Sequence, residues 1–363
     1  MCKSRLGINL VLILSVALWA STVRALSVTD MADRQVELVA APDRVVCLGP
    51  GALRLIVYLE ATAKVIAVED MEKKNPGGRP YWHAHPELVE LPRCGPGGPV
   101  GINKKPDLEA LLAVRPQVIF ITYMDAELAD EVQSILGIPV VVLSYGAFAT
   151  FDTAVYEALA IAGQVLGREE RARAVVAYIE SLRQDLGERT RTIPVDERPG
   201  VYVGGIGYRG AQGIESTERA YIPFDWVHAS NLAGKVERKL GSHAFVDKEI
   251  LLGLDPAAIF IDGGGYALVA EDVRRKPAFY AALTAFRQKR VYRLLPFNWY
   301  TTNIGTALAD AYAIGKILYP GRFDDVDLAR KADEIYTFLV GKPAYGHMRT
   351  DYGTLGEAAP FLN

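Results

Sequence analysis

Two segments of the chain combine large aromatic rings with the glycine and proline residues that interrupt regular structure. Aromatic rings bury much apolar area and have few rotamers to immobilise, so they suit contact with an organic ligand. We expect residues 75–86 and 296–303 to be irregular loops that contact a ligand, although the rings of the first loop could instead pack locally. The rings concerned belong to Tyr81, Trp82, Trp299 and Tyr300.

Histidine side chains raise the alternative that the chain binds zinc, manganese or nickel directly, with help from a carboxylate. His83 and His85 flank Ala84, a spacing too short for a helical pair, although a loop could place them together. His228 and His243 are the other candidates. Neither a Cys-x-x-Cys nor a His-Glu-x-x-His motif is present, so we expect no structural zinc site.

The sequence contains no motif typical of catalysis. There is no Gly-x-Ser-x-Gly nucleophile elbow, and the glycine-rich segment 204–210 lacks the Gly-Lys-Ser/Thr of a phosphate loop. Glu69 and Asp70 are adjacent, but their position after a predicted strand favours an exposed pair at the strand end. We therefore expect no catalytic residue, no enzyme activity and no resident cofactor.

The N-terminus has the features of a secretory signal peptide. Lys3 and Arg5 precede an apolar run at residues 10–20, and small or permissive residues lead to a cleavage position after Ala25. The run is too short for a comfortable transmembrane helix, although an uncleaved anchor is the alternative. We expect residues 1–25 to direct the chain to the periplasm.

Charge and cysteine content narrow the class of protein further. The net charge is −3 and there is no basic block, which argues against a nucleic-acid partner and against electrostatic attachment to a membrane surface. The exported chain would keep Cys47 and Cys94. Export permits a disulfide between them, but two buried thiols are an equally good interpretation.

Short apolar strands alternate with helices, which indicates mostly parallel sheets covered on both faces. The predicted strands lie at 45–49, 64–68, 117–121 and 140–143 and, after a long interval, at 201–203, 256–262 and 290–294. A β-ribbon is predicted at 28–39, and short helices at 229–234 and 279–286. Tyr123 and Tyr145 follow two of the strands in the first half. The carboxyl ends of parallel strands are where ligands bind in open α/β sheets, so both tyrosines are candidate ligand contacts.

A long amphipathic helix is predicted from Gly167 to Thr192, between the two strand-rich regions. We interpret it as a rigid connection between two lobes, although it could be a surface helix of one large domain. The sequences Asp107-Leu-Glu109 and Asp247-Lys-Glu249, each followed by a proline and a buried strand, repeat about 140 residues apart, which supports two similar lobes. The expected organisation is a signal peptide at 1–25, an N-terminal lobe at 26–157, a linking helix at 158–198, a C-terminal lobe at 199–320, and a C-terminal helix and tail at 321–363.

Taken together, these segments resemble the substrate-binding proteins of bacterial ABC importers for iron-siderophore complexes, haem and vitamin B12. The resemblance covers nearly all of the mature chain. Its residues are the opening ribbon with Arg44-Val-Val, Pro106-Asp-Leu-Glu109 with Arg115-Pro116, Leu166-Gly167, Ala229-Ser-Asn231-Leu-Ala-Gly234, Val246-Asp-Lys-Glu249 with Asp255-Pro256, and Lys289-Arg-Val-Tyr292. It implies the α/β fold of the class III family, in which two lobes with mostly parallel sheets are joined by one long rigid helix and the ligand lies between them.

The resemblance also implies partners. In that family a glutamate on each lobe meets arginines of the membrane permease, and Glu109 and Glu249 occupy the matching positions, although both could be ordinary solvated residues of a helix. The implied partners are an ABC permease and its ATPase, with the chain itself a monomer. Many relatives carry a Thr-Glu pair where this chain has Leu53-Arg54, which implies a divergent ligand class.

We therefore predict an exported binding protein that delivers an iron-siderophore or related metal chelate to a permease. Direct binding of a transition metal, or of a corrinoid, is the alternative. Arg209 could pair with an anionic chelate, and the stiff helix predicts modest closure of the lobes. The predicted ligand contacts are Tyr81, Trp82, Tyr123 and Tyr145 of the first lobe and Tyr208, Arg209, Trp226, Trp299 and Tyr300 of the second.

Overall fold

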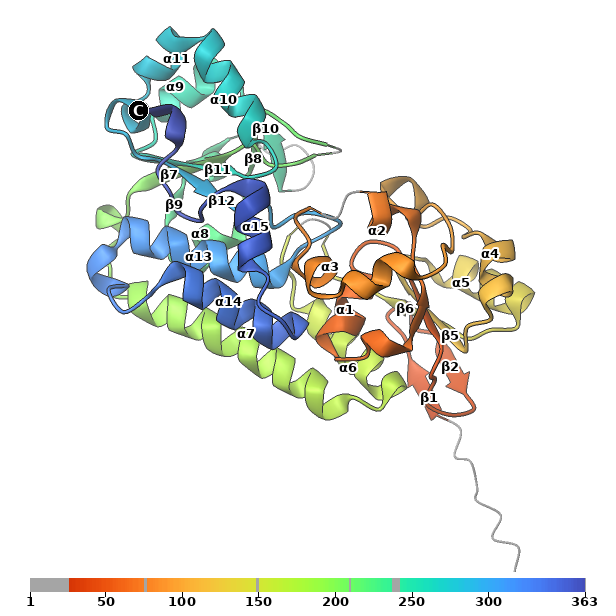
Figure 1. Ribbon diagram of the computed structural model, residues 1–363. Coiled ribbons are helices and arrows are strands. Elements are labelled where there is room, and N and C mark those ends of the chain that lie inside the picture. Colours follow the sequence, from red (N-terminus) through yellow and green to blue (C-terminus); the bar gives the residue numbers. More distant parts are fainter. Residues whose placement is uncertain (1–25, 75–76, 148–149, 209, 237–241, 363) are drawn as a thin grey trace, which may run out of the picture.

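The computed structural model describes residues 26–74, 77–147, 150–208, 210–236 and 242–362. These residues form two lobes, each built on its own four-stranded parallel sheet (Figure 1). The expected signal segment 1–25 and Arg209 lie outside the described residues. No helix in the described part of the chain has the length and apolar character needed to cross a membrane.

The first lobe is built on short strands made almost wholly of apolar residues. Their order in the sheet is β4 (Val65–Ala67), β3 (Val45–Leu48), β5 (Val118–Thr122) and β6 (Val140–Leu143), and every pairing is parallel. Both faces are covered, which is why these strands carry apolar side chains at consecutive positions. The covering helices are α1 (Ala52–Tyr58) and α6 (Ala154–Leu166) on one face and α4 (Leu108–Val114) and α5 (Ala126–Leu136) on the other.

The second lobe repeats this plan. The strand order is β12 (Val291–Leu294), β11 (Ala258–Asp262), β7 (Gly200–Gly204) and β9 (Ser230–Asn231), again all parallel. A separate antiparallel pair joins β8 (Ser216–Glu218) to β10 (His243–Phe245). One face of the main sheet packs on α8 (Ile222–Trp226) and α13 (Ile304–Leu318), and the other on α9 (Lys248–Leu254), α10 (Tyr266–Arg275), α11 (Pro277–Ala282) and α12 (Thr284–Arg287).

The long connecting helix is confirmed as α7 (Glu169–Thr190), which has 22 residues. At 1.5 Å per residue it is about 33 Å long. Figure 1 shows it passing along the base of the second lobe to reach α6 at the first. The predicted apolar face is buried at Ala172, Val175, Ile179, Leu182 and Leu186. The wider linking segment 158–198 is not one helix, because Gly167 adopts a left-handed conformation (φ 68°) that ends α6.

The repeated sequences form matching structures in the two lobes. Asp107 precedes α4 and Asp247 precedes α9. Each of these helices ends at a non-glycine residue in the left-handed region, Arg115 at φ 49° and Asp255 at φ 36°, immediately before the proline that leads into the next strand. The internal similarity read from the sequence is therefore real, and it extends to the helix C-caps.

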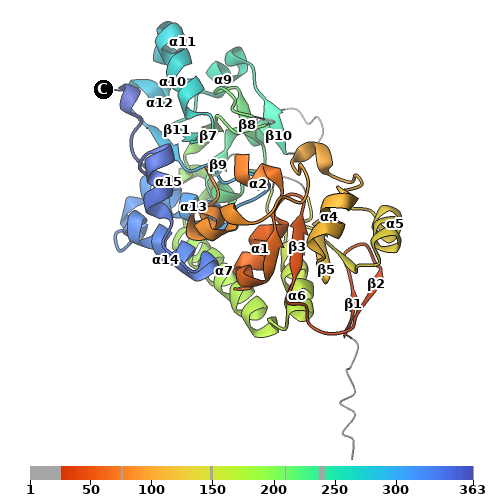
Figure 2. The same ribbon diagram turned by 45° about the vertical axis from the view of Figure 1, so that its right-hand side comes forward.

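Helices also bridge the lobes near the C-terminus, where only one helix and a tail were expected. α14 (Leu328–Val340) packs on α1 and on the short helix α3 (Pro80–Ala84), and α15 (Tyr345–Tyr352) packs on α3 as well. At the opposite, outer end of the first lobe, β1 (Leu26–Thr29) and β2 (Gln35–Leu38) form the predicted hairpin beside β6 (Figures 1 and 2).

Three local predictions were wrong. Residues 75–86 are not wholly irregular, because Pro80 occupies the first turn of α3, a position where a missing N–H costs nothing. Residues 229–234 form β9 and a 3₁₀ turn in place of a helix, with the Asn231 side chain accepting from Ala233 N at 3.0 Å. The helix expected at 279–286 is divided into α11 and α12 by the extended Leu283.

Candidate ligand site between the lobes

Residues 296–303, which follow β12 of the second lobe, lie across the first lobe. We call this segment the crossing loop. It meets the first lobe where the strands of the first sheet end: near Gly51 after β3, Glu69 after β4, Tyr123 after β5 and Tyr145 after β6. Thr302 Oγ1 also donates to the carbonyl oxygen of Thr150, at 3.0 Å. The strand ends where the sequence predicted a ligand are therefore in direct contact with the other lobe.

Arg54 of α1 holds the crossing loop through the carbonyl groups of that loop. Its side chain is completely buried, and its guanidinium donates to the carbonyl oxygens of Thr302 at 2.7 Å and of Trp299 and Tyr300 at 3.0 Å each. The rings of Tyr81 and Tyr145 lie 5.2 and 5.8 Å from the guanidinium carbon, within the range of a cation–π contact. This arginine therefore joins the two lobes through three carbonyl groups of the crossing loop, while two rings of its own lobe lie against it.

The guanidinium of Arg54 remains charged in this buried position. Burial lowers the pKa of Arg54, but the side chains of Tyr145, Tyr81, Tyr58 and Glu72 raise it, and the net result is a pKa above the usual value. No carboxylate of the described residues lies within ion-pair distance of Arg54, since Glu72 is itself paired with Arg79 at 2.6 Å. At contact distance the positive charge is thus offset by carbonyl dipoles and ring faces.

Glu69 provides a second connection between the lobes. It accepts a hydrogen bond of 2.5 Å from the Tyr300 hydroxyl and one of 3.0 Å from Gly49 N, and Gly98 N donates to the same hydroxyl at 3.0 Å. Burial raises the pKa of Glu69 to about 7, and these hydrogen bonds oppose the shift only in part. The prediction that Glu69 belongs to an exposed pair is wrong, because the crossing loop covers it and leaves 5 % of it exposed.

The backbone at the centre of this contact is unusual. Tyr300 and Thr301 are consecutive residues in the left-handed region, at φ 53° and 62°, and Tyr123 faces them at φ 59°. A β-branched residue such as threonine seldom adopts this conformation, and strained residues of this kind concentrate at ligand sites and clamps. Opposite them, a Cβ on Gly51 would lie 2.6 Å from the Tyr145 ring and 2.7 Å from Thr301 Cγ2, so only glycine fits there.

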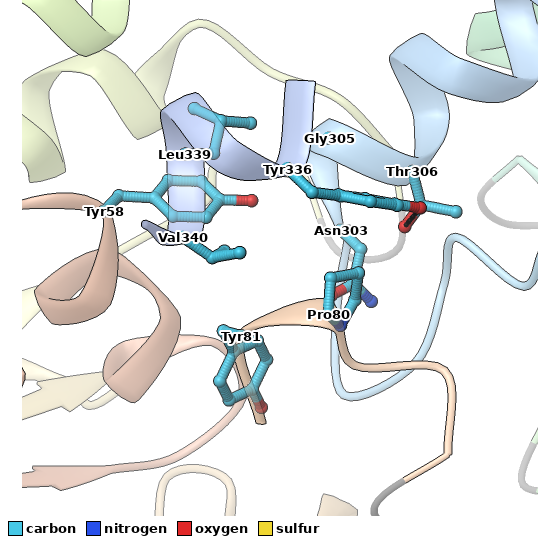
Figure 3. A pocket seen from close by; sticks show the side chains of 9 residues that line it. All are labelled: Tyr58, Pro80, Tyr81, Asn303, Gly305, Thr306, Tyr336, Leu339 and Val340. Atoms are coloured by element: carbon cyan, nitrogen blue, oxygen red, sulfur yellow. Dashed lines mark hydrogen bonds between the residues drawn. The ribbon is translucent and has the colours of Figure 1, made fainter. Parts of the chain in front are cut away.

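Three of the predicted first-lobe rings are buried with partners of their own. Tyr81 is 1 % exposed and donates to Glu72, Trp82 lies against the Arg79 guanidinium at 5.6 Å, and the Tyr145 hydroxyl donates to Gly51 O at 3.0 Å. Tyr81 lines a narrow space between the lobes that Tyr58 and α14 also line, and this space has no room for a water-sized sphere (Figure 3). The fourth ring, Tyr123, is half-buried against Thr301. Direct ligand contact by these four rings stays a prediction.

The predicted second-lobe rings fall into separate groups. Trp299 and Tyr300 belong to the crossing loop, whereas Trp226 is 8 % exposed and packs against Phe151, 5.4 Å away. Tyr208 is 44 % exposed and stacks on His243 at 4.3 Å, with Phe245 against both rings. The structure therefore gathers Tyr81, Tyr145, Trp299 and Tyr300 around Arg54, and it places Tyr208 and Trp226 in other ring clusters.

The histidines do not converge on a metal. His85 contacts Val340 O and His228 contacts Thr190 Oγ1, while His243 contacts Ser216 Oγ. His83 instead stacks on His347. Across the described ranges no group of three or more His, Cys, Asp or Glu side chains is arranged to hold a metal ion. Cys47 and Cys94 are both buried free thiols, which decides between the two interpretations of the cysteines.

Glu109 and Glu249 occupy equivalent, exposed positions in the first turns of α4 and α9. Their exposure suits contact with another protein, and the docking role stays a prediction. The residues that sequence reasoning missed are Arg54, Glu69 and Thr301. Arg54 alone left a signal, since a charged residue interrupts the apolar run Leu53-Arg54-Leu-Ile-Val57.

Two similar parallel sheets, a single long connecting helix and a contact zone at the strand ends define a two-lobed binding protein with its candidate site between the lobes. The family model described as "Periplasmic binding protein" matches residues 45–296. The chain therefore belongs to the periplasmic binding proteins, which serve ABC importers, and it is a transport protein and not an enzyme.

Individual proteins resemble the chain over most of its length. The molybdate-binding protein MolA of Haemophilus influenzae is 25 % identical over 331 residues, covering 85 % of this chain and 89 % of MolA. The structure of MolA bound to molybdate superposes with a TM-score of 0.69 at 22 % identity, covering 87 % of this chain and 98 % of that one.

Two further structures have the same fold. A periplasmic solute-binding protein of Veillonella parvula has a TM-score of 0.72 at 17 % identity, with 91 % of this chain and 97 % of that chain covered. The nickel–histidine complex of Helicobacter pylori CeuE has a TM-score of 0.62 at 16 % identity, with 88 % and 96 % covered. Identities this low support the shared fold and carry no information on the ligand.

Proposed function

We propose that this binding protein is exported by residues 1–25 and carries a small metal oxyanion of the molybdate class to an ABC permease. The observation that supports this most strongly is the similarity to molybdate-binding MolA along most of both chains. The geometry supports a small ligand as well, because Gly51, Tyr145 and Thr301 bring the lobes into direct contact. The metal would enter as part of the ligand, and we expect no resident cofactor.

A metal chelate, such as an iron-siderophore complex, is the second candidate. The exposed rings of Tyr208 and Phe245 favour it, because such rings offer apolar area to an organic ligand. A bare transition metal ion has less support, since the described residues offer no suitable group of ligands. The aromatic groups and the oxyanion similarity thus point to different ligands, which a binding screen can separate.

The test is thermal unfolding of the purified mature chain with molybdate, tungstate, sulfate, a ferric siderophore, haem and nickel–histidine. A ligand that binds only the folded state stabilises it by about 2.7 kcal/mol at 100 times its Kd. We expect molybdate and tungstate to raise the unfolding temperature more than sulfate does. A response to the siderophore or haem, with none to either oxyanion, would contradict the proposed ligand and favour the chelate.

A further inference from the structure

The carbonyl groups of the crossing loop have a common direction. Those of Trp299, Tyr300 and Thr302 accept hydrogen bonds from Arg54. No peptide bond of the described chain is cis, and a trans peptide holds its N–H opposite its C=O. The N–H groups of the same three peptide units belong to Tyr300, Thr301 and Asn303, and they therefore point away from Arg54.

Two of these three N–H groups have no acceptor among the described residues. Asn303 N donates to Phe297 O at 2.7 Å, but no hydrogen bond in the described ranges starts from Tyr300 N or Thr301 N. Both residues are buried, with 7 % and 2 % of their surface exposed. An unpaired buried N–H is costly, and most such groups in folded proteins have a partner. Two adjacent donors in this state indicate a place for an acceptor that comes from outside the chain.

The positive charge of Arg54, on the carbonyl side of the crossing loop, favours an anion as that acceptor. Arg54 is fully buried and has no carboxylate at ion-pair distance among the described residues. A buried cation with no counter-charge at ion-pair distance stabilises a negative charge placed nearby. The peptide groups between Arg54 and the free N–H groups have their carbonyl ends toward the cation, so their dipoles add to its field at the N–H side. The same loop also carries a third donor, Trp299 Nε1, which is buried with no partner in the described chain.

We propose that the N–H groups of Tyr300 and Thr301, with Arg54 behind them, form the oxyanion-binding site of the cleft. Their ligand is a tetrahedral dianion, two of whose oxygens accept from the two N–H groups. This inference rests on the proposed oxyanion function and assigns its anchoring atoms. Arg54 is a positioning residue in this arrangement, because it orients the loop and adds charge without touching the ligand.

Two measurements on the unaltered chain test the assignment directly. Crystals grown with tungstate should place two tungstate oxygens within hydrogen-bond distance of Tyr300 N and Thr301 N. In solution, molybdate should shift the amide ¹⁵N and ¹H resonances of these two residues more than those of Asn303, whose N–H is already paired. An ion located elsewhere in the cleft, or unchanged amide resonances at a saturating concentration, would overturn the assignment while leaving oxyanion binding itself intact.

Substitutions of Arg54 test its positioning role. Arg54→Met should weaken molybdate binding roughly a hundredfold. Arg54→Lys keeps the charge but cannot keep the hydrogen bonds to all three carbonyl groups, so it should weaken binding roughly tenfold. The matched control is Arg171→Met. Arg171 of α7 also donates to carbonyl groups, those of Tyr58 and Phe338. Neither carbonyl belongs to the crossing loop, so Arg171→Met should leave molybdate affinity unchanged.

The outcomes of these experiments are distinguishable. If the unaltered chain binds no oxyanion, the proposed function fails together with this inference. If the unaltered chain binds molybdate and both Arg54 variants bind it with the same affinity as the unaltered chain, only the proposed role of Arg54 fails. If Arg54→Met does not fold, Arg54→Lys and the amide resonances of the unaltered chain still decide the question.

Discussion

Individual residues in the contact zone have roles that depend on partners far away in the sequence. Glu69 and Tyr300 are 231 positions apart, yet their 2.5 Å hydrogen bond connects the two lobes. Arg54 and Thr302 are 248 positions apart and are joined in the same way. Each pair buries a polar or charged group that would be costly if its partner were absent.

Glu69 should make stability depend on pH. Its folded-state pKa is raised to about 7 from an ordinary value of 4.5, so the folded protein holds the proton more tightly than the unfolded chain. The resulting stability is present below about pH 4.5 and is lost as the pH rises through 7. At 1.36 kcal/mol per pKa unit, the loss is about 3 kcal/mol.

The comparison that isolates Glu69 is Glu69→Gln, measured by urea unfolding at pH 5 and pH 8. The stability of the variant relative to the original chain should increase by about 2.5 kcal/mol between these pH values, because the other buried carboxyl groups are the same in both chains. Parallel stability curves would show that Glu69 does not titrate in this range.

At the scale of single elements, α1 and the crossing loop are fitted to each other at Gly51. This glycine precedes α1 at φ 83° and leaves room for Thr301 and for the Tyr145 ring. The helix has only seven residues, and all of them are buried, including Arg54. A helix this short is stabilised mainly by its packing and little by its intrinsic propensity.

Gly51→Ala should therefore disturb both stability and ligand binding. Left-handed backbone alone costs a non-glycine residue about 1–2 kcal/mol, and the clash should add about 1–3 kcal/mol. The matched control is Gly137→Ala, since Gly137 is also left-handed, at φ 63°, but a Cβ there would meet nothing within 4 Å. In urea unfolding, Gly137→Ala should lose only the stability that the left-handed backbone costs, whereas Gly51→Ala should also lose the contribution from the clash. Calorimetry should show weaker molybdate binding only for Gly51→Ala. Equal effects of the two substitutions would contradict the fitted contact.

At the scale of the whole molecule, the lobes are joined by several elements. α7 connects them at the base, α14 and α15 of the C-terminal segment pack on α3 of the first lobe, and the crossing loop spans the strand ends. This arrangement is consistent with the modest closure expected of a stiff connecting helix, which stays a prediction.

The docking prediction also belongs to the whole molecule. The double variant Glu109→Ala/Glu249→Ala should bind its ligand normally, because both side chains are exposed and, among the described residues, α4 and α9 give no hydrogen bond or ion pair to the crossing loop. It should fail to support uptake through the cognate permease. Glu127→Ala is the control, since Glu127 is exposed in the first turn of α5 in a comparable way. Uptake by the double variant at the rate of the control would exclude the docking role.

The sequence by itself determined the features that depend on local pattern. Apolar strands, the amphipathic α7, the Asp-capped start of α4 and the repeat shared by the two lobes all follow from residue spacing and helix-capping chemistry, and all are present in the structure. Tyr145, Trp299 and Tyr300, which the sequence predicted as ligand contacts near strand ends, lie where the lobes meet, and their contact with a ligand stays a prediction.

Only the tertiary structure decided how those residues meet. Nothing local shows that Arg54 will be buried under three carbonyl groups, that Glu69 will be covered by Tyr300, or that two peptide N–H groups will be left without an acceptor. Burial and hydrogen-bond satisfaction are set by chain segments more than 200 positions apart, and a single sequence carries no record of which distant segments pack together. The candidate ligand site is made of such contacts, so more of the fold than of the site could be predicted from the sequence.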